Sequence, residues 1–250
     1  MAKVITVSTP KGGVGKTTLA YYLATMYQEK GKTLIIDTDS QGNITKFLLG
    51  NENPLEDHNN FVSLFRKKNI TPLPLNENLY LIGSNIDLAE YDSKNELNYF
   101  FILSKYLKKE SSKYDYIIID TPPNLGMFTL NALLATEYVV APLDPSEDAL
   151  DGIGVLVKTV NEMKEDHNEK IKLIGLVLNA IDLRNNADQK IFDKTKDKYN
   201  SLLFKDSIPR TTRIRDARAS YKSILDTQPE HKVSIALLNI FKELNERMGA

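Results

Sequence analysis

A glycine-rich loop between an expected strand and an expected helix is the feature that most constrains this chain. Residues 9–18 read Thr-Pro-Lys-Gly-Gly-Val-Gly-Lys-Thr-Thr, between the apolar segment Val4–Ser8 and a helical pattern over Thr17–Lys30. Glycines let backbone N–H groups approach an anion, and the N-terminus of the following helix attracts the same negative charge. Spacing and context together predict a phosphate-binding loop at the start of the fold.

The expected ligand of this loop is ATP with Mg²⁺. In this pattern Lys16 reaches the terminal phosphates, and the Thr17 hydroxyl ligates the metal. The alternative is a glycine-rich turn with a chance lysine, but the strand before it and the helix after it argue against that interpretation. Nucleotide binding is expected from eight consecutive residues: Lys11, Gly12, Gly13, Val14, Gly15, Lys16, Thr17 and Thr18.

Strand-length apolar runs alternate with helical patterns along the chain. Strands are expected at Val4–Ser8, Thr33–Asp37, Leu79–Gly83, Tyr116–Asp120, Tyr138–Pro142 and Leu173–Asn179, and helices at Thr17–Lys30, Leu97–Lys108, Met127–Ala135, Asp148–Glu165 and Asp188–Tyr199. Most of the strands are apolar throughout, as in a parallel sheet buried on both faces. The alternation predicts an α/β fold: a doubly wound, mostly parallel sheet with helices on both faces. We expect one domain over residues 1–250, with Asn51–Asn78 as a surface insertion.

The composition narrows the function classes. The chain has no cysteine, which excludes disulfides, a thiolate nucleophile and cysteine-held metal clusters. No stretch approaches the roughly 20 apolar residues of a membrane helix, and the N-terminus lacks the pattern of a signal peptide. The formal net charge is -1, so any surface for nucleic acid must be local. We expect a cytoplasmic protein.

Aspartates follow two of the expected strands. Asp37-Thr38-Asp39-Ser40-Gln41-Gly42-Asn43 ends the second strand, and Tyr116-Ile117-Ile118-Ile119 leads to Asp120 at the end of another. Ligands bind at the carboxyl ends of strands in open α/β sheets. An acid after a β-rich run has the form of the segment that holds Mg²⁺ near bound phosphates, which gives Asp120 a metal role. Turn formation is the alternative use of Asp37 and Asp39.

These motifs resemble those of the ParA/MinD superfamily. Lys-Gly-Gly-Val-Gly-Lys-Thr-Thr resembles its deviant Walker A motif, and Asp37–Asn43 and Asp120-Thr121-Pro122-Pro123 resemble its two switches, with Ser40 where proline is usual. The resemblance, which covers nearly the whole chain, implies that Lys11 crosses a dimer interface to phosphates of the partner. There it would stabilise transition-state charge as an arginine finger does. It also implies that Asp39 orients the attacking water, that Asp37 lies near Mg²⁺, and that the adenine is bordered by Asn179, Pro209 and Arg210.

Among these proteins the chain most resembles short ParA/Soj-type partition ATPases. That resemblance implies an ATP-dependent homodimer that binds nonspecific DNA, becomes nucleoid-associated, and hydrolyses ATP when a ParB-type centromere-binding protein stimulates it. Because the phosphate loop begins so close to Met1, we expect no N-terminal helix-turn-helix domain. Residues 205–222 carry six basic and two acidic side chains. Basic side chains that contact phosphates set affinity without reading sequence. The expected DNA-binding residues are Arg210, Arg213, Arg215, Arg218 and Lys222.

ATPases with this kind of loop serve three other functions. MinD-like positioning at a membrane would favour a net basic C-terminal amphipathic helix, but Lys242 and Arg247 are balanced by Glu243 and Glu246. We therefore expect this helix to pack on the sheet, with no membrane partner. ATP-driven electron transfer or metal handling needs cysteines, which are absent. A relative that positions a protein cargo over the nucleoid remains an open alternative, because its ATPase could look the same.

Overall fold

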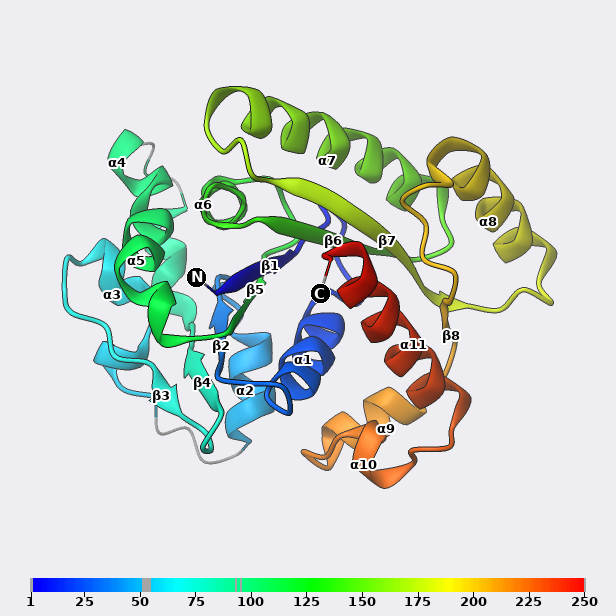
Figure 1. Cartoon of the computed structure of the whole chain (residues 1–250), viewed down its shortest axis with the longest axis horizontal. Helices are drawn as coiled ribbons and strands as arrows, with labels where there is room; N and C mark the ends of the chain where they lie inside the picture. The colour runs from blue at the N-terminus through cyan, green and yellow to red at the C-terminus, as the bar shows by residue number, and fades with distance from the viewer. Residues whose placement is uncertain (1, 51–54, 93, 95, 250) are drawn as a thin grey trace.

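The computed structural model describes residues 2–50, 55–92, 94 and 96–249. Within them, eight strands form one sheet in the order β3-β4-β2-β5-β1-β6-β7-β8, parallel except for β3 (Figure 1). The strands are β1 (Lys3–Val7), β2 (Thr33–Asp37), β3 (Leu73–Pro74), β4 (Leu79–Ile82), β5 (Tyr116–Asp120), β6 (Tyr138–Leu143), β7 (Lys172–Ile181) and β8 (Ile208–Pro209). The sheet confirms the expected α/β class, and its six longer strands are those expected from the apolar runs.

Helices cover both faces of this sheet. The α-helices are α1 (Lys16–Tyr27), α2 (Asn43–Leu49), α3 (Val62–Phe65), α4 (Leu97–Phe100), α5 (Ile102–Glu110), α6 (Met127–Ala135), α7 (Glu147–Asp166), α8 (Asn186–Tyr199), α9 (Arg213–Ala219), α10 (Ile224–Thr227) and α11 (Lys232–Arg247). Short 3₁₀ segments are η1 (Asp57–Asn59), η2 (Ile86–Tyr91) and η3 (Ser111–Lys113). In Figure 1, α1 and α11 lie on one side of the sheet and α6 and α7 on the other.

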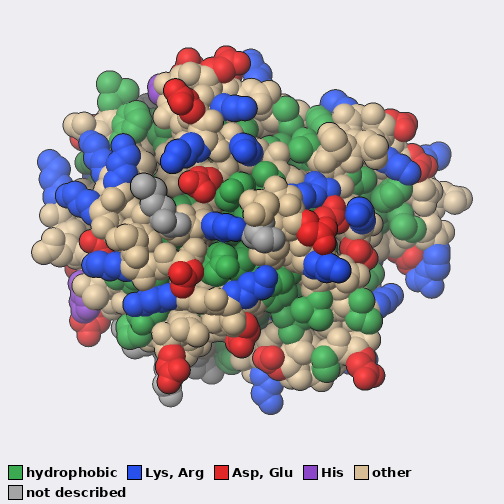
Figure 2. All heavy atoms as spheres, viewed as in Figure 1, with side chains coloured by type: hydrophobic (Ala, Val, Ile, Leu, Met, Phe, Trp, Pro, Cys, Tyr) green, Lys and Arg blue, Asp and Glu red, His purple; other side chains and the backbone are tan. Residues whose placement is uncertain are grey.

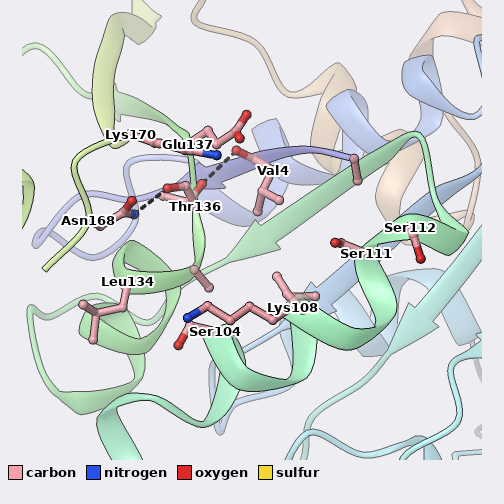
Figure 3. Close-up of a pocket in the computed structure, with 13 residues that line it drawn as sticks. Val4, Ser104, Lys108, Ser111, Ser112, Leu134, Thr136, Glu137, Asn168 and Lys170 are labelled. Atoms are coloured by element: carbon pink, nitrogen blue, oxygen red, sulfur yellow. Dashed lines mark hydrogen bonds between the residues drawn. The ribbon is translucent and has the colours of Figure 1, made fainter.

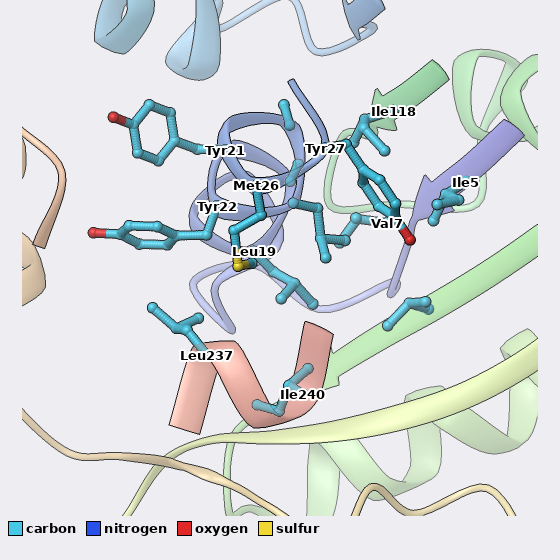
Figure 4. Packing of buried hydrophobic residues seen from close by; sticks show 14 of the residues in the cluster. Ile5, Val7, Leu19, Tyr21, Tyr22, Met26, Tyr27, Ile118, Leu237 and Ile240 are labelled. Atoms are coloured by element: carbon cyan, nitrogen blue, oxygen red, sulfur yellow. The ribbon is translucent and has the colours of Figure 1, made fainter. Parts of the chain in front are cut away.

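Successive residues along a strand pack into different hydrophobic cores. Ile35 and Ile118 pack into the core under α1 and α11, whereas their neighbours Leu34 and Ile117 pack under α5 and α6. A third core joins β6 and β7 to α7. Figure 4 shows the first core, where side chains of α1 meet Ile5, Val7 and Ile118 of the strands and Leu237 and Ile240 of α11. Because side chains alternate across a strand, an apolar run buried on both faces requires helices on both sides.

Three local expectations need correction. The helix expected over Leu97–Lys108 is split at Phe101 into α4 and α5. The stretch 51–78 is not only a surface insertion, because Phe61, Val62 and Phe65 are buried in the core under α5 and α6; residues 51–54 of that stretch lie outside the described residues. Helix α2 and the short elements β3, β8, α9 and α10 were not expected. None of the helices in the described part is long and apolar enough to cross a membrane.

Strand register brings the ends of three strands together. Asp120 pairs with Val7 of β1 on one side and with Asp37 of β2 on the other. Thr121 Oγ1 donates to the Val7 carbonyl at 3.0 Å, and Thr38 Oγ1 donates to the Asp120 carbonyl at 2.7 Å. The glycine-rich loop leaves β1 at this edge. The register therefore gathers the predicted phosphate and metal ligands at one place.

Candidate functional site at the carboxyl edge of the sheet

The glycine-rich loop has a backbone that only glycine adopts easily. Gly13 and Gly15 have φ values of 77° and 98°, and Gly15 is the N-cap of α1. A Cβ on Gly15 would lie 2.3 Å from Asn179 Nδ2, which donates to the Val14 carbonyl at 2.8 Å. Asn179, expected beside adenine, thus lies against the loop from the end of β7. This contact fixes the loop in front of the α1 N-terminus, where backbone N–H groups favour an anion.

Lys16 is largely buried at the start of α1. Its side chain crosses the loop, and Nζ donates to the Lys11 carbonyl at 2.7 Å. Burial lowers the pKa of the Lys16 ammonium, while the carboxylates of Asp120 and Asp39 oppose that shift. Among the described residues, the Lys11 carbonyl is the one acceptor for this buried cation, so its other N–H donors can bind an incoming phosphate. The position agrees with the predicted phosphate contact of Lys16, which stays a prediction.

Asp120 is fully buried at the end of β5. Among the described residues, neither of its carboxylate oxygens has a hydrogen-bond partner. Burial raises the pKa of Asp120 well above its usual value, and the neighbouring Asp37 carboxylate raises it further. The Thr17 hydroxyl lies close enough to lower this pKa, although its geometry falls short of a hydrogen bond. An orphaned buried carboxylate is costly unless a cation or proton compensates it. Hard oxygen donors suit Mg²⁺, so Asp120 and the Thr17 hydroxyl fit the predicted metal role.

Asp37 holds the first switch segment together. Its Oδ1 accepts from Asp39 N at 3.0 Å, and its Oδ2 accepts from Thr45 N at 3.2 Å and from Thr45 Oγ1 at 2.7 Å. Burial raises the pKa of Asp37, while the bonds from Thr45 and Asp39 act in the opposite direction. Thr45 Oγ1 in turn accepts from Ser84 N at 2.9 Å. Sequence reasoning missed Thr45, since only the fold brings it to Asp37.

Asp39 shapes the turn that follows β2. Its side-chain Oδ1 accepts from Gln41 N at 3.0 Å, and its carbonyl accepts from Gly42 N at 2.9 Å. Gly42 takes a positive φ of 60° and is the N-cap of α2. Ser40, where the family has proline, lies inside this turn. Within the part of the chain that the structure describes, the other carboxylate oxygen of Asp39 accepts no hydrogen bond. The Asp39 carboxylate lies near Lys16, which is compatible with the predicted contact to water.

Lys11 contacts its own chain. Its Nζ donates to Asp144 Oδ1 at 3.1 Å, to Asp144 Oδ2 at 3.2 Å and to Ser146 Oγ at 2.7 Å. Asp144 and Ser146 belong to the segment between β6 and α7 and had not been singled out from the sequence. The partner-directed role of Lys11 stays a prediction, and in this single chain the side chain is held in cis.

A small cavity of about 210 Å³ lies beside the loop at the predicted base-binding side. Pro209 of β8 lines it, whereas Arg210 turns away: Nε donates to the Ala180 carbonyl at 3.1 Å and Nη2 to Asp188 at 3.2 Å. The lining residues are Thr18, Asn179, Ala180, Pro209, Thr211, Ile214, Arg215 and Arg218. The structure thus places two predicted base-side residues, Asn179 and Pro209, at one cavity.

The predicted DNA-binding arginines differ in their surroundings. Arg213, Arg215 and Lys222 are exposed on or beside α9. Arg218 instead lies over the Phe47 ring, 5.4 Å from its centroid, and Nη2 donates to the Asn43 carbonyl at 3.4 Å. Basic and acidic side chains are interspersed on the face shown in Figure 2. Arg213 and Arg215 are therefore the clearest candidates for contact with an external anion.

A second cavity, of about 320 Å³, lies beside the start of β1, away from the phosphate loop (Figure 3). Thr136 Oγ1 donates to the Val4 carbonyl at 2.8 Å, and Asn168 Nδ2 donates to the Thr136 carbonyl at 2.7 Å. These bonds close the wall between β1 and β6. No predicted site residue lines this cavity, so it plays no part in the candidate site.

Comparison with known proteins identifies the family. Residues 2–173 match a family model described as an AAA domain. The sporulation initiation inhibitor protein Soj of Bacillus subtilis is 31% identical over 255 residues, which cover 98% of each chain. The chain belongs to the ParA/Soj family of partition ATPases. The expected family is therefore confirmed, and with it the P-loop ATPase class of the chain. The roles of residues 11–18 stay predictions.

Solved structures of relatives contain nucleotide. A plasmid partition protein of Borrelia burgdorferi bound to AMPPNP has 25% identity and a TM-score of 0.85, covering 99% of this chain and all of that one. A cobyrinic acid a,c-diamide synthase of Mycobacterium smegmatis with ADP and magnesium has 27% identity and a TM-score of 0.81, covering all of this chain and 96% of that one. Structures similar to this ParA/Soj-family chain thus hold adenine nucleotide and, in one case, magnesium.

Proposed function

We propose that this ParA/Soj-family chain is an ATP-dependent dimerising ATPase for plasmid or chromosome partition. The observation that carries the proposal is the second lysine, Lys11, on a loop that already provides Lys16. Lys16 points across its own loop, so it serves phosphates bound in its own subunit. Part of the Lys11 side chain is exposed, so it is accessible to a partner subunit.

Within one subunit, Lys16, the loop N–H groups and the α1 N-terminus bind the phosphates. Thr17 and Asp120 would hold Mg²⁺, with Asp37 fixing the switch beside them. Bound Mg²⁺ supplies charge neutralisation at the phosphate oxygens. Asp39 orients a water for attack on the terminal phosphate, and Lys16 stabilises the negative charge that develops there.

Dimerisation completes the site. Each Lys11 reaches the phosphates of the other subunit and adds a cation where transition-state charge develops. Hydrolysis is thereby tied to the dimer, because a monomer has one lysine fewer at its phosphates. Loss of the terminal phosphate removes the contact that Lys11 makes in trans, and the dimer separates.

The output of the cycle is binding to nonspecific DNA. Arg213 and Arg215 are exposed on α9. Arg215 and Arg218 also line the base-side cavity, and Arg218 lies over Phe47 of α2. Two subunits together present four such exposed arginines to backbone phosphates, which carry no sequence information. A ParB-type partner stimulates hydrolysis and releases the protein from the nucleoid.

The test is binding to random-sequence duplex DNA, measured by fluorescence anisotropy with Mg·ATP, Mg·ADP or no nucleotide. Binding that requires ATP and weakens steeply with salt supports the proposal. The same samples are mixed with anionic liposomes and sedimented. ATP-dependent binding to liposomes but not to DNA would contradict the proposal in favour of positioning at a membrane.

A further inference from the structure

The Lys11 ammonium occupies a small site built by its own chain. Three acceptor contacts, two to the Asp144 carboxylate and one to the Ser146 hydroxyl, lie between 2.7 and 3.2 Å. An ammonium has three N–H donors, and these contacts can use all of them. The acceptors are 133 and 135 residues from Lys11 along the chain, so the contact depends on tertiary structure and not on the local geometry of the loop.

The two acceptors are themselves held in place. Ser146 Oγ donates to Asp144 Oδ1 at 2.9 Å, and Ser146 N donates to the Asp144 carbonyl at 2.8 Å. Ser146 is also the N-cap of α7, with its Oγ accepting from Ala149 N at 3.2 Å. Since β6 ends at Leu143 and α7 begins at Glu147, the acceptors stand between two regular elements. The site is therefore preformed for a cation and does not depend on Lys11 to order it.

Occupation of this site conflicts with a contact in trans. While its donors serve Asp144 and Ser146, Lys11 has none left for a phosphate of another subunit. The side chains of Lys11 and Asp144 are 28% and 34% exposed, so water can replace the broken contacts and the cost of release is small. The contact can thus be opened by a stronger anion.

We propose that Asp144 and Ser146 are positioning residues that hold Lys11 in cis in the monomer and release it only to phosphates of an ATP-bound partner. This inference rests on the proposed role of Lys11 in trans. An exposed ion pair shifts an equilibrium by about two- to fivefold. A dimer opens two such contacts, so removing them tightens dimerisation by about four- to twentyfivefold. The dimer is therefore weaker than it would be if Asp144 and Ser146 did not hold Lys11. Its formation also depends more strongly on bound ATP.

The test measures the dimer dissociation constant by sedimentation velocity in Mg·AMPPNP. Asp144→Asn removes the carboxylate charge and should tighten the dimer by about four- to twentyfivefold. Asp144→Glu keeps the charge and should stay within about twofold of the native protein. Glu162→Gln removes a similar exposed charge that faces Lys158 on α7, and it should change nothing. An unchanged or weaker dimer for Asp144→Asn overturns the holding role.

Lys11→Ala separates this inference from the proposed function. On the Lys11→Ala background, Asp144→Asn should have no effect on dimerisation, because its effect requires the lysine. An equal effect with and without Lys11 overturns the holding role and assigns the change to repulsion between subunits. If Lys11→Ala itself dimerises as tightly as the native protein in Mg·AMPPNP, the proposed role of Lys11 in trans fails, whatever the Asp144 variants do.

Discussion

The charged side chains are buried at the carboxyl edge of the sheet and exposed on the basic helix α9. At the edge, Lys16, Asp37 and Asp120 are buried. Their positions are set by strand register and by a loop whose positive φ values at Gly13 and Gly15 favour glycine. On α9, Arg213 and Arg215 are exposed on a helix of seven residues. Changes at the edge should therefore alter binding and folding together. A change at Arg213, which is not among the residues lining the base-side cavity, should alter only contacts with an external partner.

The largest expected effect is at Lys16. Lys16→Ala removes a buried, charge-assisted phosphate contact, so the affinity for Mg·ATP should fall by at least about 100-fold. Isothermal titration calorimetry measures it, with the exposed Lys46→Ala as the control that keeps native affinity. Affinity retained by Lys16→Ala would remove the phosphate-loop assignment and, with it, the contrast between the two regions.

Gly15→Ala should destabilise the fold through the glycine-rich loop at the carboxyl edge of the sheet. The positive φ and the clash with Asn179 should destabilise the chain by about 2 kcal/mol or more, since a left-handed alanine is strained and the Asn179 bond to Val14 is lost. Chemical denaturation reports the difference. Gly13→Ala is the matched variant, because it shares the positive φ but meets no atom within 4 Å. Equal losses in both variants would show that packing against Asn179 contributes nothing.

Charge reversal on and beside α9 should leave folding unchanged. The double variant Arg213→Glu, Lys222→Glu spares Arg215, which lines the base-side cavity. It should weaken binding to random-sequence DNA by about tenfold or more, and it should reduce the slope of log affinity against log salt by up to about 4 per dimer. Thermal unfolding and dimerisation should match the native protein. Undiminished DNA binding would move the basic surface elsewhere on the molecule.

The smallest effect is expected at Asp120, where a substitution should raise the stability of the nucleotide-free protein. Asp120→Asn removes a buried carboxylate that has no hydrogen-bond partner among the described residues. The nucleotide-free protein should become more stable by about 1 kcal/mol, while its stabilisation by Mg·ATP should decrease. Thermal unfolding with and without Mg·ATP measures both. A destabilised nucleotide-free variant would show that the Asp120 charge is already compensated.

The sequence predicts the elements and motifs that neighbouring residues define, but it does not predict contacts between distant segments. The strands, the phosphate loop and Asp120 were visible because apolar runs and glycine spacing are properties of neighbouring residues. The contacts of Lys11 with Asp144, and of Asn179 with Val14, join segments more than a hundred residues apart and leave no pattern in the sequence. Counting charges over residues 205–222 likewise could not reveal that Arg218 packs on Phe47 while Arg215 stays exposed.

The proposed ATPase cycle depends on a dimer that forms through Lys11 when ATP is bound. The most direct measurement is the mass of the Asp39→Ala protein in Mg·ATP, by sedimentation or light scattering, with and without Lys11→Ala. We predict a stable dimer for Asp39→Ala, because the water would no longer be oriented for hydrolysis, and a monomer once Lys11 is also removed. A dimer of equal stability in the double variant would contradict the central claim.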